Sequence, residues 1–329
     1  MNRAEKTVRA IDRLQQRVPW LAFPVAVWKK FGDDQAGNLA ALIAYYAFAS
    51  LFPLLLVLVT VVDIVLRHDP ALQARVKNSA FSQFPVIGQQ LSGDVQSLKE
   101  TGAALAIGLI LSFLGARGVA NAVQNALNTI WAVPYTRRPG FPWNQLRSIG
   151  LILVVGIGMI TTSLLSGLVA AGAGHILGGP LPNVGAVAVA LLANIGLFWL
   201  GFRLGTASEV STRSLLLSAV IAGVVWQILQ LVGSYYVSHV LNRSSALYGI
   251  FGLVLGVIAW LYLQAQFTLY AVEAAVVKEH RLWPRSLVQP PLTPQDRQAY
   301  EMYVWTAQRR PEQSIEVRTE QGSRTGTEG

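Results

Sequence analysis

The sequence contains no cysteine, so it offers no disulfide, no thiolate nucleophile and no cysteine-based metal site. It is also poor in charge, because only 13% of its 329 residues are Asp, Glu, Lys or Arg, whereas soluble proteins carry about 25%. Hydrophobic residues make up 53% of the chain, and the mean hydropathy is +0.43. This composition predicts an integral membrane protein.

Catalytic motifs are missing as well. The sequence has no HExxH, no GxxxxGK[ST] and no GxSxG, and its four histidines are far apart. A hydrolytic metal centre needs clustered histidines and carboxylates, which the sequence does not show. We therefore expect no enzyme, no cofactor and no metal, and an enzyme that acts on lipid or RNA is the least favoured alternative.

Long apolar runs dominate the middle of the chain. A helix needs roughly 20 mostly apolar residues to cross the hydrocarbon core, and these runs are continuous, unlike the alternating strands of a membrane barrel. The expected fold class is all-α, a polytopic membrane helical bundle of about six transmembrane helices within residues 39–280. The expected spans are residues 39–66, 103–131, 149–171, 184–202, 215–237 and 246–272, and the last helix is expected to continue to about His280.

The formal charge of +9 lies mostly in segments that flank the apolar runs. This distribution indicates an anionic membrane surface as the partner rather than nucleic acid. If both termini are cytoplasmic, most of the 26 Lys and Arg residues lie on the cytoplasmic side of the membrane. Because cytoplasmic loops are enriched in Lys and Arg, this topology is predicted.

The segments outside the bundle differ from one another. Residues 1–38 read either as an amphipathic helix on the inner membrane surface, with basic residues between apolar ones, or as an ordinary solvated basic segment. Residues 67–101, the first outer loop, are expected to hold short surface helices. Residues 281–329 are expected to form a cytoplasmic tail that is largely disordered.

Ionisable and amide side chains within the apolar runs are the candidate site residues, because polar groups at membrane depth need a partner or a cavity. The second run carries four of them on one helical face. They indicate either a substrate pathway or a polar seam that holds helices together, with the seam slightly favoured. The four are Arg117, Asn121, Asn125 and Asn128.

Further candidates lie in other runs: Gln227 and Gln230 in the fifth, and Gln266 in the sixth. Two carboxylates, Asp63 and Glu273, are predicted to couple protons or to form ion pairs.

Several partners are open for these charges. If Glu273 forms an ion pair, basic residues such as Lys278, Arg147 and Arg203 are candidate partners. A pair of Arg117 with Asp63 or with Glu273 is also open.

Three stretches resemble the YihY/BrkB family of bacterial inner-membrane proteins. They are AALIAYYAFASLFPLLLVL at residues 40–58, RGVANAVQNALNTIW at 117–131, and SALYGIFGLVLGVIAWLYLQAQFTLYAVEAAVV at 245–277. The resemblance implies a six-helix protein of the bacterial inner membrane. Some family members carry the label ribonuclease, but this sequence shows no metal or acid–base site for RNA. The family usually has Gly-Ala-Glu near the end of the last helix, where this chain has Ala271, Val272 and Glu273.

Two functions follow from these residues. The first is a transporter or exporter of a lipid or an anionic solute, in which Arg117 binds the anion, since a guanidinium matches phosphate or carboxylate. The alternative is a non-catalytic envelope scaffold whose polar residues only pack the helices. Membrane lipids are the expected partners, and the sequence predicts no oligomeric state.

Overall fold

The structure, a computed structural model, describes residues 3–65, 68–71, 73–74, 102–158, 181–236, 242–310 and 312–313. The regular elements in this part of the chain are helices, which confirms the all-α class for these residues. The helices are α1 (Arg3–Arg17), α2 (Pro19–Asp33), α3 (Ala36–Val65), α6 (Gly102–Ile130), α8 (Leu181–Gly205), α9 (Thr212–Tyr236), α10 (Asn242–His280) and α11 (Pro294–Thr306), with a short 3-10 helix at Tyr135–Arg137. Residues 143–158 form a further helix.

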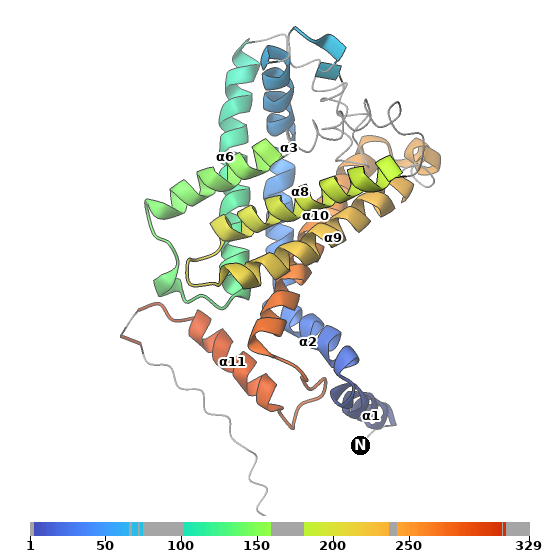
Figure 1. Cartoon of the computed structure of the whole chain (residues 1–329), viewed down its shortest axis with the longest axis vertical. Helices are drawn as coiled ribbons and strands as arrows, with labels where there is room; N and C mark the ends of the chain where they lie inside the picture. Colours follow the sequence, from blue (N-terminus) through green and yellow to red (C-terminus); the bar gives the residue numbers. More distant parts are fainter. Residues whose placement is uncertain are drawn as a thin grey trace, which may run out of the picture.

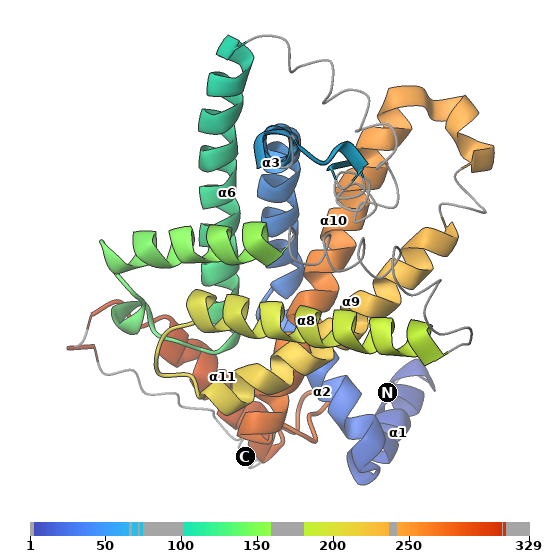
Figure 2. The ribbon, with the colours of Figure 1, turned by 45° about the horizontal axis from the view of Figure 1, so that its top comes forward.

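The helices form one bundle with a smaller cluster at one end. Helices α3 and α6 lie side by side, and α8, α9 and α10 cross them obliquely (Figures 1 and 2). Helix α10 packs against α9, α3 and α2, so it links the bundle to the terminal cluster. That cluster holds α1, α2 and α11 at the lower end of Figure 1. The two terminal segments therefore lie at the same end of the molecule.

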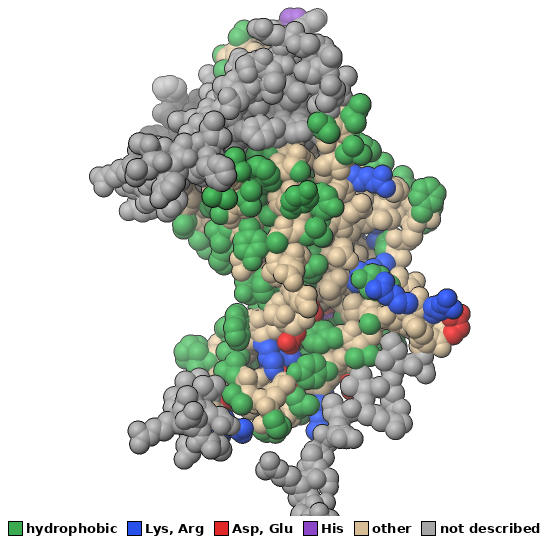
Figure 3. Space-filling view, turned by 180° about the vertical axis from the view of Figure 1, so that it is seen from behind, with side chains coloured by type: hydrophobic (Ala, Val, Ile, Leu, Met, Phe, Trp, Pro, Cys, Tyr) green, Lys and Arg blue, Asp and Glu red, His purple; other side chains and the backbone are tan. Residues whose placement is uncertain are grey.

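Three helices in the described part are long and apolar enough to cross a membrane: Val187–Gly205, Thr212–Gln230 and Val254–His280. The last of these confirms that the final apolar helix continues to His280. Apolar side chains cover much of the upper half of the described surface, and most of the Lys and Arg side chains in this view lie below them (Figure 3). The molecule is a membrane protein, and its six spans stay a prediction beyond these three.

The bundle core lies where the start of α3, the end of α6 and the end of α10 meet. Small buried residues, including Ala36, Ala40, Ala126 and Ala275, line this contact. Small side chains let helix backbones approach closely, which replaces the hydrophobic driving force that is missing in lipid. Beside them, the rings of Phe31 and Tyr270 stack with centroids 3.8 Å apart, and this contact fixes α2 against α10.

The N-terminal segment contains two helices, α1 and α2. Helix α2 begins at Pro19, whose fixed φ and missing N–H suit a first helical position. Ala22, Ala26 and Phe31 of this helix are buried, while Trp20 and Trp28 are exposed. This division is typical of a helix at a membrane–water interface.

The segment after α10 needs a correction, because residues 281–310 are ordered where the sequence predicted a largely disordered tail. Helix α11 begins with a capping box in which the Thr293 hydroxyl accepts from the Asp296 N–H and the Asp296 carboxylate accepts from the Thr293 N–H. Pro294 stands at the first helical position. The polar composition of the segment indicated disorder, so this helix-start signal was not recognised in the sequence.

A close contact between α3 and α6 gives the first prediction. A Cβ added at Gly115 would lie 2.5 Å from the Ser50 Cβ and 3.0 Å from its Cα. The Gly115→Ala variant is therefore expected to lose about 1–3 kcal/mol of stability through overpacking. Gly201→Ala is the matched control, because a Cβ there meets nothing within 4 Å. Thermal unfolding in detergent measures both, and equal midpoints would contradict the close packing.

Candidate functional site

The polar face of α6 begins with an exposed cation. Arg117 and Asn121 are exposed, and they continue a helical stripe whose outer part is the exposed apolar pair Ile110 and Leu114. Among the described residues Arg117 forms no ion pair. The proposed pair with Glu273 is not formed, and the side chain of Asp63 lies outside the described part of α3.

The same face becomes a packed seam toward the end of α6. The Ser148 hydroxyl, from the helix at 143–158, donates to Asn121 Oδ1 at 3.2 Å and accepts from Gln124 Nε2 at 2.8 Å. Ser148 and Gln124 are buried. These contacts join α6 to the next helix through satisfied polar groups.

Asn128 closes the end of α8. Its Nδ2 donates to the Gln124 carbonyl at 2.7 Å and to the Gly205 carbonyl at 3.3 Å, and its Oδ1 accepts from the Ala207 N–H at 2.9 Å. The last carbonyls of a helix have no partner within the helix. The buried Asn128 amide therefore serves as a cap for α8.

Asn125 contacts the loop after α6 instead. Its Oδ1 accepts from Arg138 Nη1 at 2.9 Å, and Arg138 also donates to the Thr129 hydroxyl at 3.2 Å. The Arg138 guanidinium lies over the Tyr135 ring, 4.0 Å from its centroid. Asn125 and Asn128 thus have packing partners, and Arg117 is the exposed charged member of the stripe.

The glutamines of the other helices lie apart from this stripe. Gln227 and Gln230 on α9 and Gln266 on α10 are half-buried. Within the part of the chain that the structure describes, no hydrogen bond joins Gln227 or Gln266 to the polar side chains of α6. Direct hydrogen bonds between the described residues therefore do not connect Gln227 or Gln266 with the stripe on α6.

A second set of polar residues is a buried ionic cluster between α2, α6 and α10. Lys30 Nζ lies 3.1 Å from a carboxylate oxygen of Glu273, contacts Asp34 and donates to the Ile130 carbonyl at 3.0 Å. The Lys30 side chain is only 1% exposed, and that of Glu273 is fully buried. One ammonium thus faces two carboxyl groups.

Electrostatics dominate this cluster. Burial disfavours the Lys30 ammonium, but the attraction of Glu273 and then of Asp34 outweighs it, so the pKa of Lys30 is raised. Burial raises the pKa of Asp34 even against the attraction of Lys30. The cluster therefore requires the Lys30 ammonium, and it disfavours a negative charge on both carboxyl groups at once.

The partner of Glu273 corrects the sequence-based expectation, which favoured Lys278, Arg147 or Arg203. Arg147 donates instead to the Thr206 carbonyl at 2.9 Å. Lys30 was missed because it stands far from Glu273 in the sequence, in a segment read as lying outside the bundle. The run KKFGDD offers a local signal, since its Lys and Asp residues follow one another at i, i+4 spacing.

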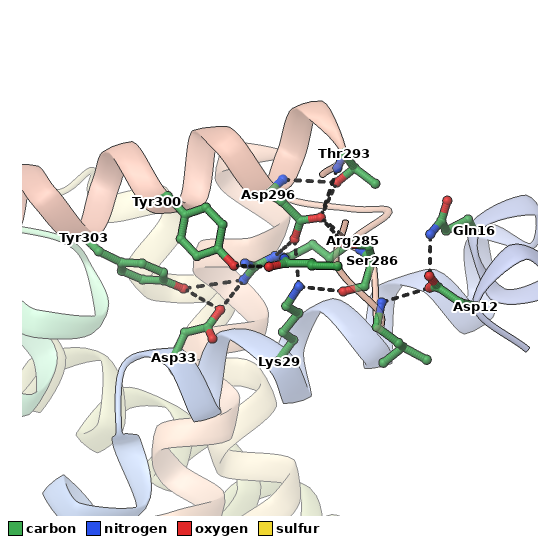
Figure 4. A network of polar contacts seen from close by, with 12 residues as sticks. Asp12, Gln16, Lys29, Asp33, Arg285, Ser286, Thr293, Asp296, Tyr300 and Tyr303 are labelled. Carbon is green, nitrogen blue, oxygen red and sulfur yellow. Dashed lines mark hydrogen bonds and ion pairs between the residues drawn. The ribbon is translucent and has the colours of Figure 1, made fainter. Parts of the chain in front are cut away.

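A third network locks the two terminal segments together (Figure 4). Arg285 is fully buried, and it lies 2.9 Å from Asp296 on α11 and 2.9 Å from Asp33 on α2. Lys29 Nζ lies 2.9 Å from the same Asp296 carboxylate. Two cations thus face two carboxylates, so their charges balance. This network of Lys29, Asp33, Arg285 and Asp296 is called the terminal lock.

Asp296 is the centre of the lock. Burial alone would raise its pKa, but the hydroxyl of Ser286, Lys29, the Ser286 N–H and Arg285 all stabilise the carboxylate, and the pKa lies below its ordinary value of 3.8. Opposite it, burial and the charge of Asp34 raise the pKa of Tyr303, whose hydroxyl donates to Asp33 at 3.2 Å. Asp296 therefore holds its charge throughout the neutral range.

No metal centre accompanies these networks in the described part of the chain, because no group of three or more His, Cys, Asp or Glu side chains is placed to hold an ion there. The helices, the apolar surface and the buried ionic junction define a helical membrane protein with an exposed arginine on α6 and a charge-locked terminal cluster.

Comparison with known proteins names the family. The family model for virulence factor BrkB matches residues 27–295, and the chain belongs to this family. The chain is also similar to inner membrane protein YhjD of Escherichia coli (strain K12), with 21% identity over 305 residues that cover 87% of this chain and 89% of that protein. No solved structure matches the chain. The match spans the ionic cluster and most of the terminal lock.

Proposed function

We propose that this protein moves an anionic lipid or an anionic solute across the inner membrane, with Arg117 as the residue that contacts the anion. The terminal cluster is placed in the cytoplasm in this proposal, in keeping with the basic residues around it. The exposed Arg117 side chain is the observation that carries the proposal.

The cost of an exposed charge supports this function. Arg117 stands roughly 20 Å along α6 from Ile130, at about 1.5 Å per residue. A guanidinium at such depth is costly unless it meets water, a neighbouring acid or an anion. Without an ion pair among the described residues, an anionic head group or solute is the partner that fits, because a guanidinium binds phosphate and carboxylate with two parallel hydrogen bonds.

The scaffold alternative has its own support in the seam of α6. Gln124, Ser148 and Asn128 are buried and hydrogen-bonded to neighbouring segments. Such bonds between helices contribute about 0.6 kcal/mol each on average. They fit a role in holding α6, α8 and the helix at 143–158 together, with or without transport.

Replacement of Arg117 separates the two functions. Arg117→Ala is expected to leave membrane insertion and abundance unchanged and to reduce transfer of anionic phospholipid at least tenfold in proteoliposomes, because it removes a charge-assisted contact. Arg213→Ala is the matched control, since Arg213 is also exposed and stands at the start of α9. A loss of abundance with unchanged transfer per molecule would favour the scaffold instead.

A further inference from the structure

The buried cluster of Lys30, Asp34 and Glu273 contains more acid than base. The Asp34 side chain is only 3% exposed, so all three members are shielded from solvent. The single ammonium contacts both carboxyl groups, but its charge can neutralise only one of them. With both carboxyl groups ionised, the cluster would hold an uncompensated negative charge in a buried site, which is strongly unfavourable.

The two carboxyl groups of the cluster also face each other. The Asp34 side chain lies within hydrogen-bonding reach of the Glu273 side chain. An ionised carboxylate has acceptor atoms only, so two carboxylates cannot form a hydrogen bond, whereas a protonated carboxyl group donates its O–H. Two carboxyl groups that share one site hold a proton because their like charges repel. The contact between Asp34 and Glu273 therefore fits one acid and one carboxylate.

The hydrogen bonds around Glu273 show the same shortage of donors. In the described part of the chain neither Glu273 carboxyl oxygen accepts a well-aligned hydrogen bond, although Lys30 Nζ lies 3.1 Å from one of them. Lys30 directs its hydrogen bonds to Asp34 and to the Ile130 carbonyl instead. A proton on one of the two carboxyl groups provides the missing donor between Asp34 and Glu273.

Within the described residues, the surrounding helices bring no second cation into ion-pair contact with Asp34 or Glu273. On α2 the neighbouring acid Asp33 is already paired with Arg285. Helix α6 contributes the Ile130 carbonyl, and its cation Arg117 stands roughly 20 Å away, at about 1.5 Å per residue. Helix α3 carries its acid, Asp63, at the opposite end. The other titratable groups whose charges act on members of the cluster are Tyr270, His280 and Tyr303.

We propose that the cluster is a proton-binding site, in which Asp34 and Glu273 share one proton beside the Lys30 ammonium. One ammonium, one carboxylate and one carboxylic acid then form a neutral site. The raised pKa of Asp34 agrees with this assignment. Release of the proton to solvent leaves one uncompensated negative charge where α2 packs on α10, and so weakens this contact. The site is separate from Arg117 and stands whether or not the protein moves an anion.

Infrared spectroscopy of the purified full chain near neutral pH tests this site, because the C=O stretch of a carboxylic acid is resolved from the bands of carboxylates. The original chain is expected to show this band. Asp34→Asn and Glu273→Gln are each expected to remove it, because either substitution leaves one carboxylate for Lys30. Glu279→Gln is the matched control and should keep the band, since Glu279 is exposed on the same α10. A band that is missing from the original chain, or that survives in both Asp34→Asn and Glu273→Gln, would overturn the site.

The pH dependence of unfolding in detergent gives a second readout. The folded-state pKa of Asp34 is raised above 3.8, so the stabilisation by the proton is complete below that pH and is lost as the pH rises through the folded-state value. Relative to Asp34→Asn, the folding equilibrium of the original chain should fall about tenfold for each pH unit above about pH 5, until the proton is released. Glu279→Gln should follow the original chain. The same pH dependence in the original chain and in Asp34→Asn would overturn the site, and Glu273→Gln gives the same comparison if Asp34→Asn does not fold.

Discussion

Lys30→Met is expected to destabilise the protein by about 3–5 kcal/mol, because it leaves Asp34 and Glu273 buried without their cation. The Glu273 carboxylate is fully buried, and its ion pair in the described part of the chain is with Lys30, at 3.1 Å. Because Lys30 also donates to the Ile130 carbonyl, the substitution removes a hydrogen bond to α6 as well. The unfolding midpoint in detergent should fall by several degrees.

Two further variants make this result specific. Lys278→Met is the matched control, since Lys278 stands near the end of the same α10 but is exposed. Glu273→Gln in the Lys30→Met background should recover part of the loss, because it removes one of the two unpaired carboxylates. If Lys30→Met and Lys278→Met unfold at the same temperature, the buried cluster does not stabilise the junction.

Asp296→Asn is expected to release the segment that follows α10. Asn offers one acceptor atom where the carboxylate accepts from Ser286, Thr293, Lys29 and Arg285. It also leaves the fully buried Arg285 with a single carboxylate partner, Asp33. Removing one member of a buried ionic network costs about 3–5 kcal/mol. Hydrogen exchange at residues 281–306 should rise strongly, while exchange in α9 stays unchanged.

The pH dependence of this effect has a definite sign. The folded-state pKa of Asp296 is depressed below 3.8, so its contribution is fully present above that pH and is lost as pH falls toward the folded-state value. The difference in the free energy of unfolding between the original chain and Asp296→Asn should therefore be constant near neutral pH and shrink below about pH 4. Glu301→Gln, at an exposed position of α11, is the control and should show no such difference. If the stability difference between the original chain and Asp296→Asn grows as the pH falls, the role of the carboxylate is contradicted.

The all-α class was predictable because it depends on local hydrophobicity. Continuous apolar runs predicted helices, and the end of the last helix at His280 follows from the pattern itself. The start of α11 was also readable, since Thr293, Pro294 and Asp296 form a helix-start signal. Composition alone, rich in Pro, Gln and Arg, led to the expectation of disorder instead.

The sequence identified residues of the candidate site but not the residues that they contact. The sequence singled out Glu273 and Arg117 because charges within apolar runs are rare. Their partners depend on which distant segments touch, and periodicity carries no information on that. Lys30 reaches Glu273 through the packing of α2 on α10, and Arg285 is buried through the folding of the terminal segments on each other. Long-range ion pairs of this kind follow from the tertiary arrangement.

In the proposed function, Arg117 contacts an anion at membrane depth. An experimental structure of the protein in nanodiscs that contain an anionic phospholipid tests it most directly. We expect phosphate density within hydrogen-bonding distance, about 2.7–3.2 Å, of the Arg117 guanidinium. A guanidinium paired with an acid of the protein and shielded from lipid and water would contradict it, and the α6 stripe would then be a seam.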